Sequence, residues 1–185
     1  MMIAIPNIQT ERTELILLTP DNAHLFLAYQ LKNKDRLAPW EPTREIDYFS
    51  DKLSLERAEA AQNDFKNGSA IRFIAIDRES KQVAAVCNFT CITREPSLSC
   101  MLGYSVSAEF EGKGIMLEVV TAGIAYVFDT LGLHRITASY MPTNLKSAKL
   151  IQKLGFEREG FAKSYLRIAG KWEDMIVCSL INKKD

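Results

Sequence analysis

A turn rich in glycine, "EGKG" at residues 111–114, separates two segments of different character. "LGYSV" before it is typical of a strand, and a long run with periodic apolar residues begins at Ile115. Glycines let a chain turn tightly and let phosphate oxygens approach the backbone. The first turn of a helix adds unpaired N–H groups and about half an elementary charge, and Lys113 adds a cation. The stretch predicts either a phosphate loop or a plain strand-to-helix turn.

Two well-known phosphate loops do not fit these residues. A P-loop reads G-x-x-x-x-G-K-S/T, whereas Lys113 lies between the glycines with no Ser or Thr close behind it. A dinucleotide-binding turn needs a third small residue three positions after Gly114, where this chain has the bulky Leu117. The sequence therefore argues against an ATPase and against an NAD-dependent enzyme.

Composition sets the class of protein in which this turn must work. The chain has 185 residues, 47% of them hydrophobic, which predicts one soluble domain over residues 1–185. The 23 basic and 23 acidic residues balance, so we expect no sequence-specific nucleic-acid binding and no attraction to a membrane. No apolar stretch has membrane-spanning length, and "MMIAIPNIQTER" does not resemble a signal peptide. We expect a cytoplasmic protein.

The cysteines and histidines do not predict a metal site. Cys87, Cys91, Cys100 and Cys178 form no C-x-x-C pair, and the chain has only two histidines. We expect reduced thiols in the core. Cys87 and Cys91 are four residues apart in a strand-like run, so we expect them to face the same side of that strand.

The elements that must position the turn can be predicted along the chain. Strand-like runs and apolar helical periodicity alternate, with Gly68 and Gly155 at predicted helix ends and Asn144 as a helix N-cap. The predicted order is a strand at 14–18, helices at 21–33 and 53–66, strands at 71–77, 82–92 and 99–106, a helix from 115 to before 132, a strand at 135–141, a helix at 145–154 and a closing hairpin at 160–181 that turns at residues 169–170. A loop is expected at 35–45.

This order, with two local motifs, resembles the GNAT N-acetyltransferases. Their pyrophosphate loop follows Q/R-x-x-G-x-G/A; here Gly114 matches, whereas Glu111 and Met116 depart from the pattern. A second family block, N-x-x-S-x-x-L-x-x-x-L-G-F, begins at Asn144. The resemblance implies an α+β (α/β) acyl-CoA N-acyltransferase fold, with a mixed, mostly antiparallel sheet of about seven strands flanked by four helices.

Further segments are similar to the RimJ/RimL branch of this family. They are "PWEP" at 39–42, "LGYS" at 102–105, "GKGIM" at 112–116, "YMPTN" at 140–144, "GFEREG" at 155–160 and "GKWED" at 170–174. The branch acetylates the N-terminal α-amine of ribosomal proteins. The resemblance is strongest to members whose substrate is the N-terminal alanine of the fifth small-subunit protein. It implies acetyl-CoA as co-substrate, and as partner a ribosomal protein N-terminus, alone or within the small ribosomal subunit.

The resemblance also assigns roles to individual residues. It places the cofactor against the loop and the neighbouring strand and helix, at Ser105, Val106, Glu111, Gly112, Lys113, Gly114, Ile115, Met116 and Asn144. The usual family acid, a tyrosine, is replaced by Ile151. The branch instead implies Ser147 as the acid for the leaving thiolate and Glu159 as the base. From the residues alone, Ser147 and Asn144 could equally serve the helix start, and Glu159 could be a solvated turn residue.

Three aromatic residues are candidates for the acceptor groove. Trp40 lies in a stiff segment between Pro39 and Pro42, and Tyr104 and Tyr140 end predicted strands. Each is expected to line the groove or to pack the core. Two alternatives to ribosomal-protein acetylation stay open: a GNAT enzyme that acts on another peptide or a small amine, and a CoA-binding ribosome-assembly factor with little turnover.

Overall fold

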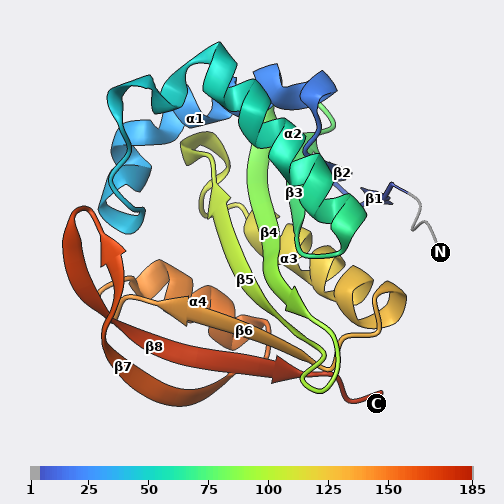
Figure 1. The fold of residues 1–185 in the computed structure, drawn as a ribbon, viewed down its shortest axis with the longest axis vertical. Helices are drawn as coiled ribbons and strands as arrows, with labels where there is room; N and C mark the ends of the chain where they lie inside the picture. Colours follow the sequence, from blue (N-terminus) through green and yellow to red (C-terminus); the bar gives the residue numbers. More distant parts are fainter. Residues whose placement is uncertain (1–4, 185) are drawn as a thin grey trace.

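The computed structural model describes residues 5–184, so the two ends of the predicted domain 1–185 lie outside the described residues. Its centre is an eight-stranded sheet in the order β1-β2-β3-β4-β5-β6-β8-β7 (Figure 1). All neighbours pair antiparallel except β5 and β6, which are parallel. The strands are β1 (Asn7–Gln9), β2 (Thr13–Leu17), β3 (Ile71–Asp77), β4 (Val83–Thr93), β5 (Ser99–Val106), β6 (Arg135–Tyr140), β7 (Glu157–Ile168) and β8 (Lys171–Ile181).

The mixed, mostly antiparallel sheet confirms the predicted fold class, and it has one strand more than expected. The addition is β1, whose three residues pair with β2 at the edge of the sheet. A strand this short is specified by its partner and leaves little periodic signal in the sequence.

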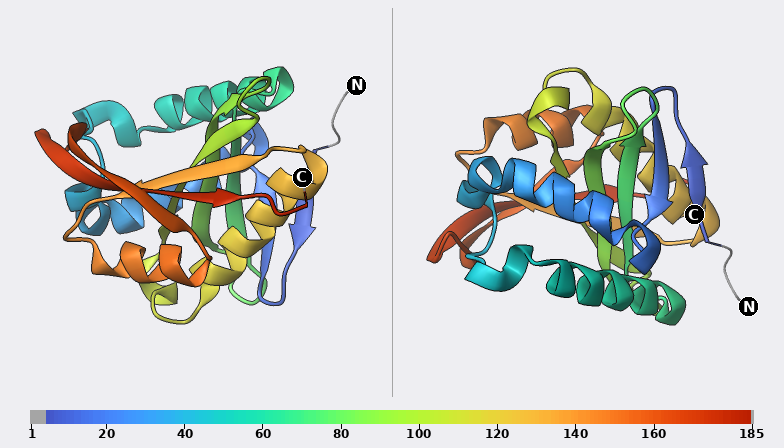
Figure 2. Two further views of the ribbon diagram at one scale, coloured as in Figure 1. Left: turned by 90° about the horizontal axis from the view of Figure 1, so that it is seen from below. Right: turned by 90° about the horizontal axis from the view of Figure 1, so that it is seen from above.

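Four helices cover the two faces of the sheet. They are α1 (Ala23–Leu37), α2 (Asp51–Asn67), α3 (Ile115–Ala125) and α4 (Leu145–Lys153). Figure 2 shows α1 and α2 on one face, with α3 and α4 on the other. The larger apolar core lies under α3 and α4, and a smaller one lies under α1 and α2.

The helix ends follow the predicted local chemistry. Ser50 accepts a hydrogen bond from the Leu53 N–H at the start of α2, and Gly68 ends α2 with φ +71°. Helix α1 runs to Leu37, beyond the predicted end at residue 33, so part of the expected loop at 35–45 is helical. A tertiary contact explains the extension, because Arg36 in this last turn donates to the carbonyl of Val106.

The face of α3 predicted to be buried is buried. Met116, Val120, Gly123, Val127 and Leu131 all lie in the core, and the helix continues through a π-turn at Tyr126–Thr130. A Cβ on Gly123 would lie 2.8 Å from the ring of Phe89. Only glycine therefore lets α3 approach β4 this closely.

Strands β5 and β6 pair over only part of their length. Residues Ser99–Leu102 of β5 pair with Arg135–Ala138 of β6. Beyond these pairs β5 continues to Val106 and β6 to Tyr140, and Figure 1 shows the two strands diverging. The edge of β5 that faces away from β4 is therefore not covered by β6 from Gly103 onward.

The prediction that Cys87 and Cys91 share one side of a strand was wrong. Cys87 is fully buried, whereas Cys91 is exposed and has φ +51°. A register shift between Thr90 and Thr93 interrupts the alternation of β4 at this point. Such an irregularity turns the next side chains to the opposite face.

No helix among residues 5–184 is long and apolar enough to cross a membrane.

Candidate active site

The glycine turn lies between β5 and α3, as the sequence predicted. Gly112 and Gly114 have φ values of +76° and +81°, a region that side chains other than glycine rarely adopt. Glu118 donates its N–H to the Gly114 carbonyl, closing the first turn of α3. The N–H groups of the residues between them have no partner within the helix. The turn is therefore built as a small cradle of backbone donors.

The side chains of the turn differ in their surroundings. Ile115 and Met116 are buried in the core, so only their backbone faces the cradle. Lys113 is exposed, with its ammonium 5.9 Å from the centre of the Phe110 ring. The cation thus lies beside the cradle and forms no direct ion pair among the contacts described.

Arg12, the residue just before β2, holds this turn. Its Nη1 donates to the Lys113 carbonyl at 2.7 Å, and its Nε donates to Glu118 at 2.7 Å. Burial favours the neutral form of Glu118, but hydrogen bonds from Thr10 and Arg12 together lower its pKa. No local sequence pattern predicts Arg12, because its partner is 101 residues away.

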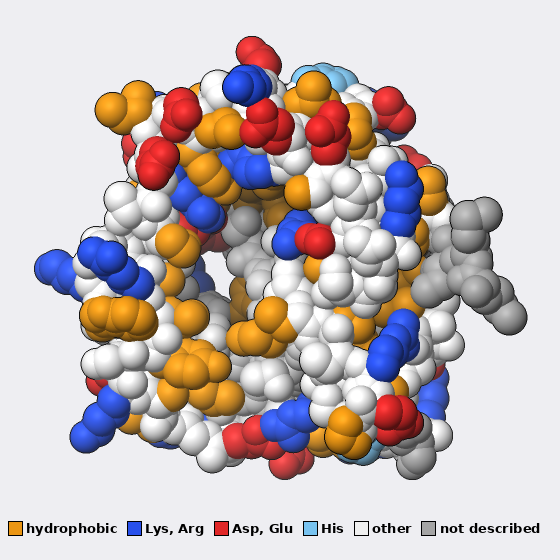
Figure 3. All heavy atoms as spheres, viewed as in Figure 1, with side chains coloured by type: hydrophobic (Ala, Val, Ile, Leu, Met, Phe, Trp, Pro, Cys, Tyr) orange, Lys and Arg blue, Asp and Glu red, His pale blue; other side chains and the backbone are white. Residues whose placement is uncertain are grey.

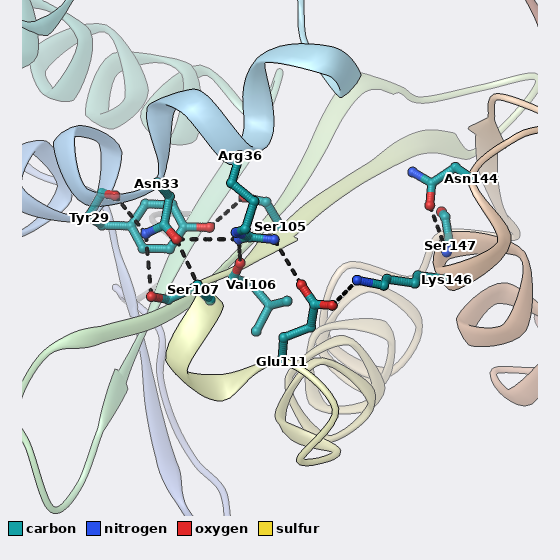
Figure 4. A network of polar contacts seen from close by, with 11 residues as sticks. Tyr29, Asn33, Arg36, Ser105, Val106, Ser107, Glu111, Asn144, Lys146 and Ser147 are labelled. Atoms are coloured by element: carbon teal, nitrogen blue, oxygen red, sulfur yellow. Dashed lines mark hydrogen bonds and ion pairs between the residues drawn. The ribbon is translucent and has the colours of Figure 1, made fainter.

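Glu111 connects the turn to two helices. Its carboxylate accepts from Arg36 of α1 at 3.0 Å and pairs with Lys146 of α4, and Figure 4 shows the three side chains converging. The contact with Lys146, and then the charge of Arg36, lower the pKa of Glu111. At the position where the general family motif has glutamine or arginine, this chain therefore has a carboxylate that binds two cations.

A polar network fixes the end of β5 against α1 (Figure 4). Arg36 donates to the Val106 carbonyl and, at 3.3 Å, to Oδ1 of Asn33. The same Oδ1 accepts from the Ala108 N–H at 3.0 Å. One turn earlier on α1, the hydroxyl of Tyr29 lies 2.8 Å from that of Ser105. Ser105 and Val106 are thus held in place just where β5 has left β6.

The opening between the two strands is bordered by hydroxyl groups. The hydroxyl of Ser147, in the first turn of α4, lies 2.5 Å from that of Tyr104 on β5. Asn144 caps this helix by accepting from the Ser147 N–H at 3.0 Å, which confirms the predicted cap. Burial raises the pKa of Tyr104 to about 12, so the phenol stays protonated at neutral pH. Tyr140, at the end of β6, is half-buried, and burial raises its pKa as well.

Glu159 is not brought to these hydroxyls. It lies on β7, pairs with Arg135 and accepts from the Ser179 hydroxyl at 2.7 Å. These two contacts, with Ser179 the larger, lower the pKa of Glu159. Arg135 and Tyr140 are the two ends of β6, roughly 16 Å apart at the rise of a strand. The base role of Glu159 stays a prediction, and its contacts do not favour it.

A cavity of about 860 Å³ lies between the sheet and the pair α1–α2. It is lined by the segment between α1 and α2, by β3 and β4, by Ser105 and by Ala169 of the β7–β8 turn. The Ala169 N–H donates to the Glu41 carbonyl at 2.9 Å, and this hydrogen bond bridges the rim of the cavity. Figure 3 shows the molecule hollowed between β5 and the β7–β8 hairpin.

The aromatic candidates take different positions around this hollow. Trp40 ends a short turn beside Glu41 and is 41% exposed, and it is not among the residues that line the cavity. Tyr140 lines a second, smaller cavity under α4. Ile151, where the family usually has its tyrosine, is buried in the core.

Within residues 5–184 no group of three or more His, Cys, Asp or Glu side chains gathers in a geometry suited to a metal ion.

Comparison with known proteins agrees with this geometry. The acetyltransferase (GNAT) domain family matches residues 12–157. A [ribosomal protein uS5]-alanine N-acetyltransferase from Escherichia coli is 37% identical over 171 residues, which are 92% of this chain and 88% of that protein. A probable N-acetyltransferase from Bacillus subtilis, YjcK, is 30% identical over 86% of this chain and 88% of its own length.

Solved structures have the same fold. A ribosomal-protein-S5-alanine acetyltransferase from Vibrio fischeri superimposes with a TM-score of 0.92 at 36% identity, covering 96% of this chain and 97% of that one. A Mycobacterium smegmatis RimJ, solved in complex with CoA-disulfide, has a TM-score of 0.90 at 21% identity and covers 98% of this chain and 90% of its own. At that identity the second likeness concerns the fold alone.

Proposed function

This chain belongs to the GNAT acetyltransferase family, and from that premise we propose that it transfers an acetyl group from acetyl-CoA to the N-terminal α-amine of a ribosomal protein. The proposed substrate is an N-terminal alanine, that of the fifth small-subunit protein, met in the cytoplasm. Support for this substrate comes from the 37% identity to a relative with that name.

The residues of the glycine turn fit the cofactor. Acetyl-CoA, when bound, supplies a thioester whose carbonyl carbon is the electrophile. The free backbone donors at residues 115–117, just after the glycine turn, would hold its pyrophosphate, with Lys113 as a nearby cation. The uncovered edge of β5 would donate to the acetyl carbonyl oxygen through the N–H of Val106, next to Ser105. Asn144 would contribute by placing the start of α4 beside the opening between the strands.

The acceptor amine needs little chemical help from the protein. An α-amine has a pKa of about 8, so a neutral fraction exists at physiological pH. Its nitrogen forms the new C–N bond as the C–S bond breaks, and its surplus proton passes to solvent or to a base. Ser147 would give a proton to the departing sulfur, and Tyr104 would restore that proton through their contact. Alignment of the reactants supplies much of the acceleration.

One observation carries this proposal: the parting of β5 from β6 above the glycine turn, with Tyr104 and Ser147 facing each other across the opening. Together with the glycine turn, this opening would supply a phosphate cradle, an uncovered strand edge and a proton donor. The same geometry would serve another peptide or a small amine. A CoA-binding assembly factor with little turnover would need the cradle alone.

The test is an assay of thiol release from acetyl-CoA with a synthetic peptide that starts with alanine. We expect turnover, and mass spectrometry should locate one acetyl group on the α-amine. The preference for the acceptor is measured with matched peptides that start with serine and with a simple primary amine. Binding of acetyl-CoA without thiol release for any of these acceptors would contradict the enzymatic proposal. Loss of α-amine acetylation from one ribosomal protein on deletion of the gene would identify the substrate.

A further inference from the structure

Two buried polar atoms in the acceptor cavity lack a hydrogen-bond partner within the described structure. They are Oδ1 of Asn88, an acceptor, and Nη1 of Arg57, a donor, and both residues line the cavity. Buried polar atoms in native proteins are almost always paired, so each such exception calls for an explanation. Their opposite character and their common cavity point to one ligand that carries both a donor and an acceptor.

Asn88 lies beside the point where the strands separate. On β4 it is directly opposite Gly103 of β5, and Gly103 follows Leu102, the last residue of β5 that pairs with β6. A Cβ on Gly103 would meet nothing within 4 Å, so the space above the glycine is open. An amine that crosses the cavity toward the opening between the strands passes over Gly103 and beside the amide of Asn88.

Arg57 is held in a fixed orientation on α2. Its Nε donates to the Leu53 carbonyl at 3.1 Å, and its Nη2 donates to Oε1 of Gln30 at 3.0 Å. Its guanidinium carbon lies 3.8 Å from the centre of the Tyr48 ring. These contacts leave Nη1 as the buried guanidinium nitrogen without a partner. A planar donor held on its other sides is well suited to a carbonyl oxygen.

We propose that Asn88 and Arg57 read the main chain of the acceptor: Asn88 accepts from its α-amine, and Arg57 donates to its first peptide carbonyl. This inference rests on the proposed acetylation of an amine at this site. It assigns the cavity to peptide N-termini as a class, because a simple amine has no carbonyl to offer Arg57. Side chains of the peptide play no part in these two contacts.

The experiment measures kcat/KM with an Ala-initiated peptide and with the same peptide whose first carbonyl is replaced by a methylene. Asn88→Ala should lower kcat/KM for both by about tenfold, the size expected for one hydrogen bond in a closed site. Arg57→Lys should lower it for the intact peptide alone. The KM for acetyl-CoA should stay within about twofold of wild type in both variants.

Two matched variants control for general disturbance. Thr90→Ala changes the same face of β4 outside the cavity, and Arg44→Lys changes a cavity arginine that lies over the Tyr48 ring but is already paired with Glu41. If Asn88→Ala fails to fold, Asn88→Leu keeps the volume without the polar atoms and should show the same loss. Equal effects of Asn88→Ala and Thr90→Ala, or equal effects of Arg57→Lys on both peptides, would overturn the inference. Absence of wild-type turnover would instead overturn the proposed function.

Discussion

The hydroxyl oxygens of Tyr104 and Ser147 lie 2.5 Å apart, one on β5 and the other on the first turn of α4. They join the strand expected to polarise the acetyl carbonyl to the helix expected to supply the proton. Because burial raises the pKa of Tyr104 to about 12, its proton is available throughout the neutral range. We propose that this phenol, from another element, takes the place of the tyrosine that family members have at position 151.

Ser147→Ala and Tyr104→Phe should both lower kcat. We expect losses of about ten- to a hundredfold, the low end of general acid catalysis, because a coenzyme thiol can leave without full protonation. Acetyl-CoA binding, measured by calorimetry, should stay nearly intact. The double variant should be no slower than the worse single one, because the two hydroxyls act as one unit. Tyr165→Phe, on the exposed hairpin, is the control. Full activity in both single variants would leave alignment as the mechanism.

Glu159→Gln tests whether this carboxylate is a base. Its contacts with Ser179 and Arg135 lower its pKa, so we expect kcat/KM near wild type at about pH 6.5 and about pH 9. The lowered pKa of Glu159 also sets the direction in which its contribution to folding stability changes with pH. The carboxylate stabilises the fold above its unfolded pKa, and this contribution is lost as pH falls through the folded pKa. A rate defect at the lower pH that shrinks at the higher pH would restore the role of base.

Gly114→Val should abolish the stabilisation that acetyl-CoA provides. Wild type should gain about 2.7 kcal/mol at a hundredfold excess over the dissociation constant. At φ +81° a branched side chain is strained, and its Cβ would lie 3.5 Å from Nη2 of Arg12, the residue that holds the turn, so the cradle should be disturbed. Gly68→Val carries similar strain at the end of α2, far from the turn, and this variant should still be stabilised by acetyl-CoA. Thermal unfolding with and without ligand measures both. Equal gains in the two variants would mean that the loop is only a turn.

Glu111→Gln should tighten acetyl-CoA binding. The change releases Arg36 and Lys146 from the carboxylate and removes a negative charge beside the phosphate cradle. We expect the dissociation constant to fall by about two- to fivefold, with a loss of stability below about 1 kcal/mol for these partly exposed pairs. That loss should fade as pH falls through the lowered pKa of Glu111. Calorimetry in low salt is the measurement, and weaker binding would show that Glu111 itself orders the loop.

Trp40→Ala should raise the KM for the peptide more than the KM for acetyl-CoA. The side chain is 41% exposed and precedes Glu41, whose carbonyl bridges to the hairpin turn at the rim of the cavity. Trp172→Ala removes a more exposed tryptophan, on the hairpin, and should change neither KM. A fall in melting temperature with equal effects on both KM values would make Trp40 a packing anchor.

The sequence alone determined the parts of this protein that depend on nearby residues. The helix ends at Gly68 and Gly155, the cap at Asn144 and the glycine turn before α3 follow from backbone preferences of one or a few residues. The buried face of α3 follows from a period of 3.6 residues. Together with the family motifs, these local patterns were sufficient for the fold class and the acetyltransferase family.

Tertiary structure alone decided which distant groups meet. Arg12 reaches Lys113, Arg36 reaches Glu111, and Tyr104 rather than Glu159 reaches Ser147, across separations that no local period encodes. The irregularity of β4 that exposes Cys91 also depends on pairing with β5. A hydrogen bond needs two atoms about 3 Å apart, and for residues far apart in sequence that distance is set by the packing of the whole sheet and its helices.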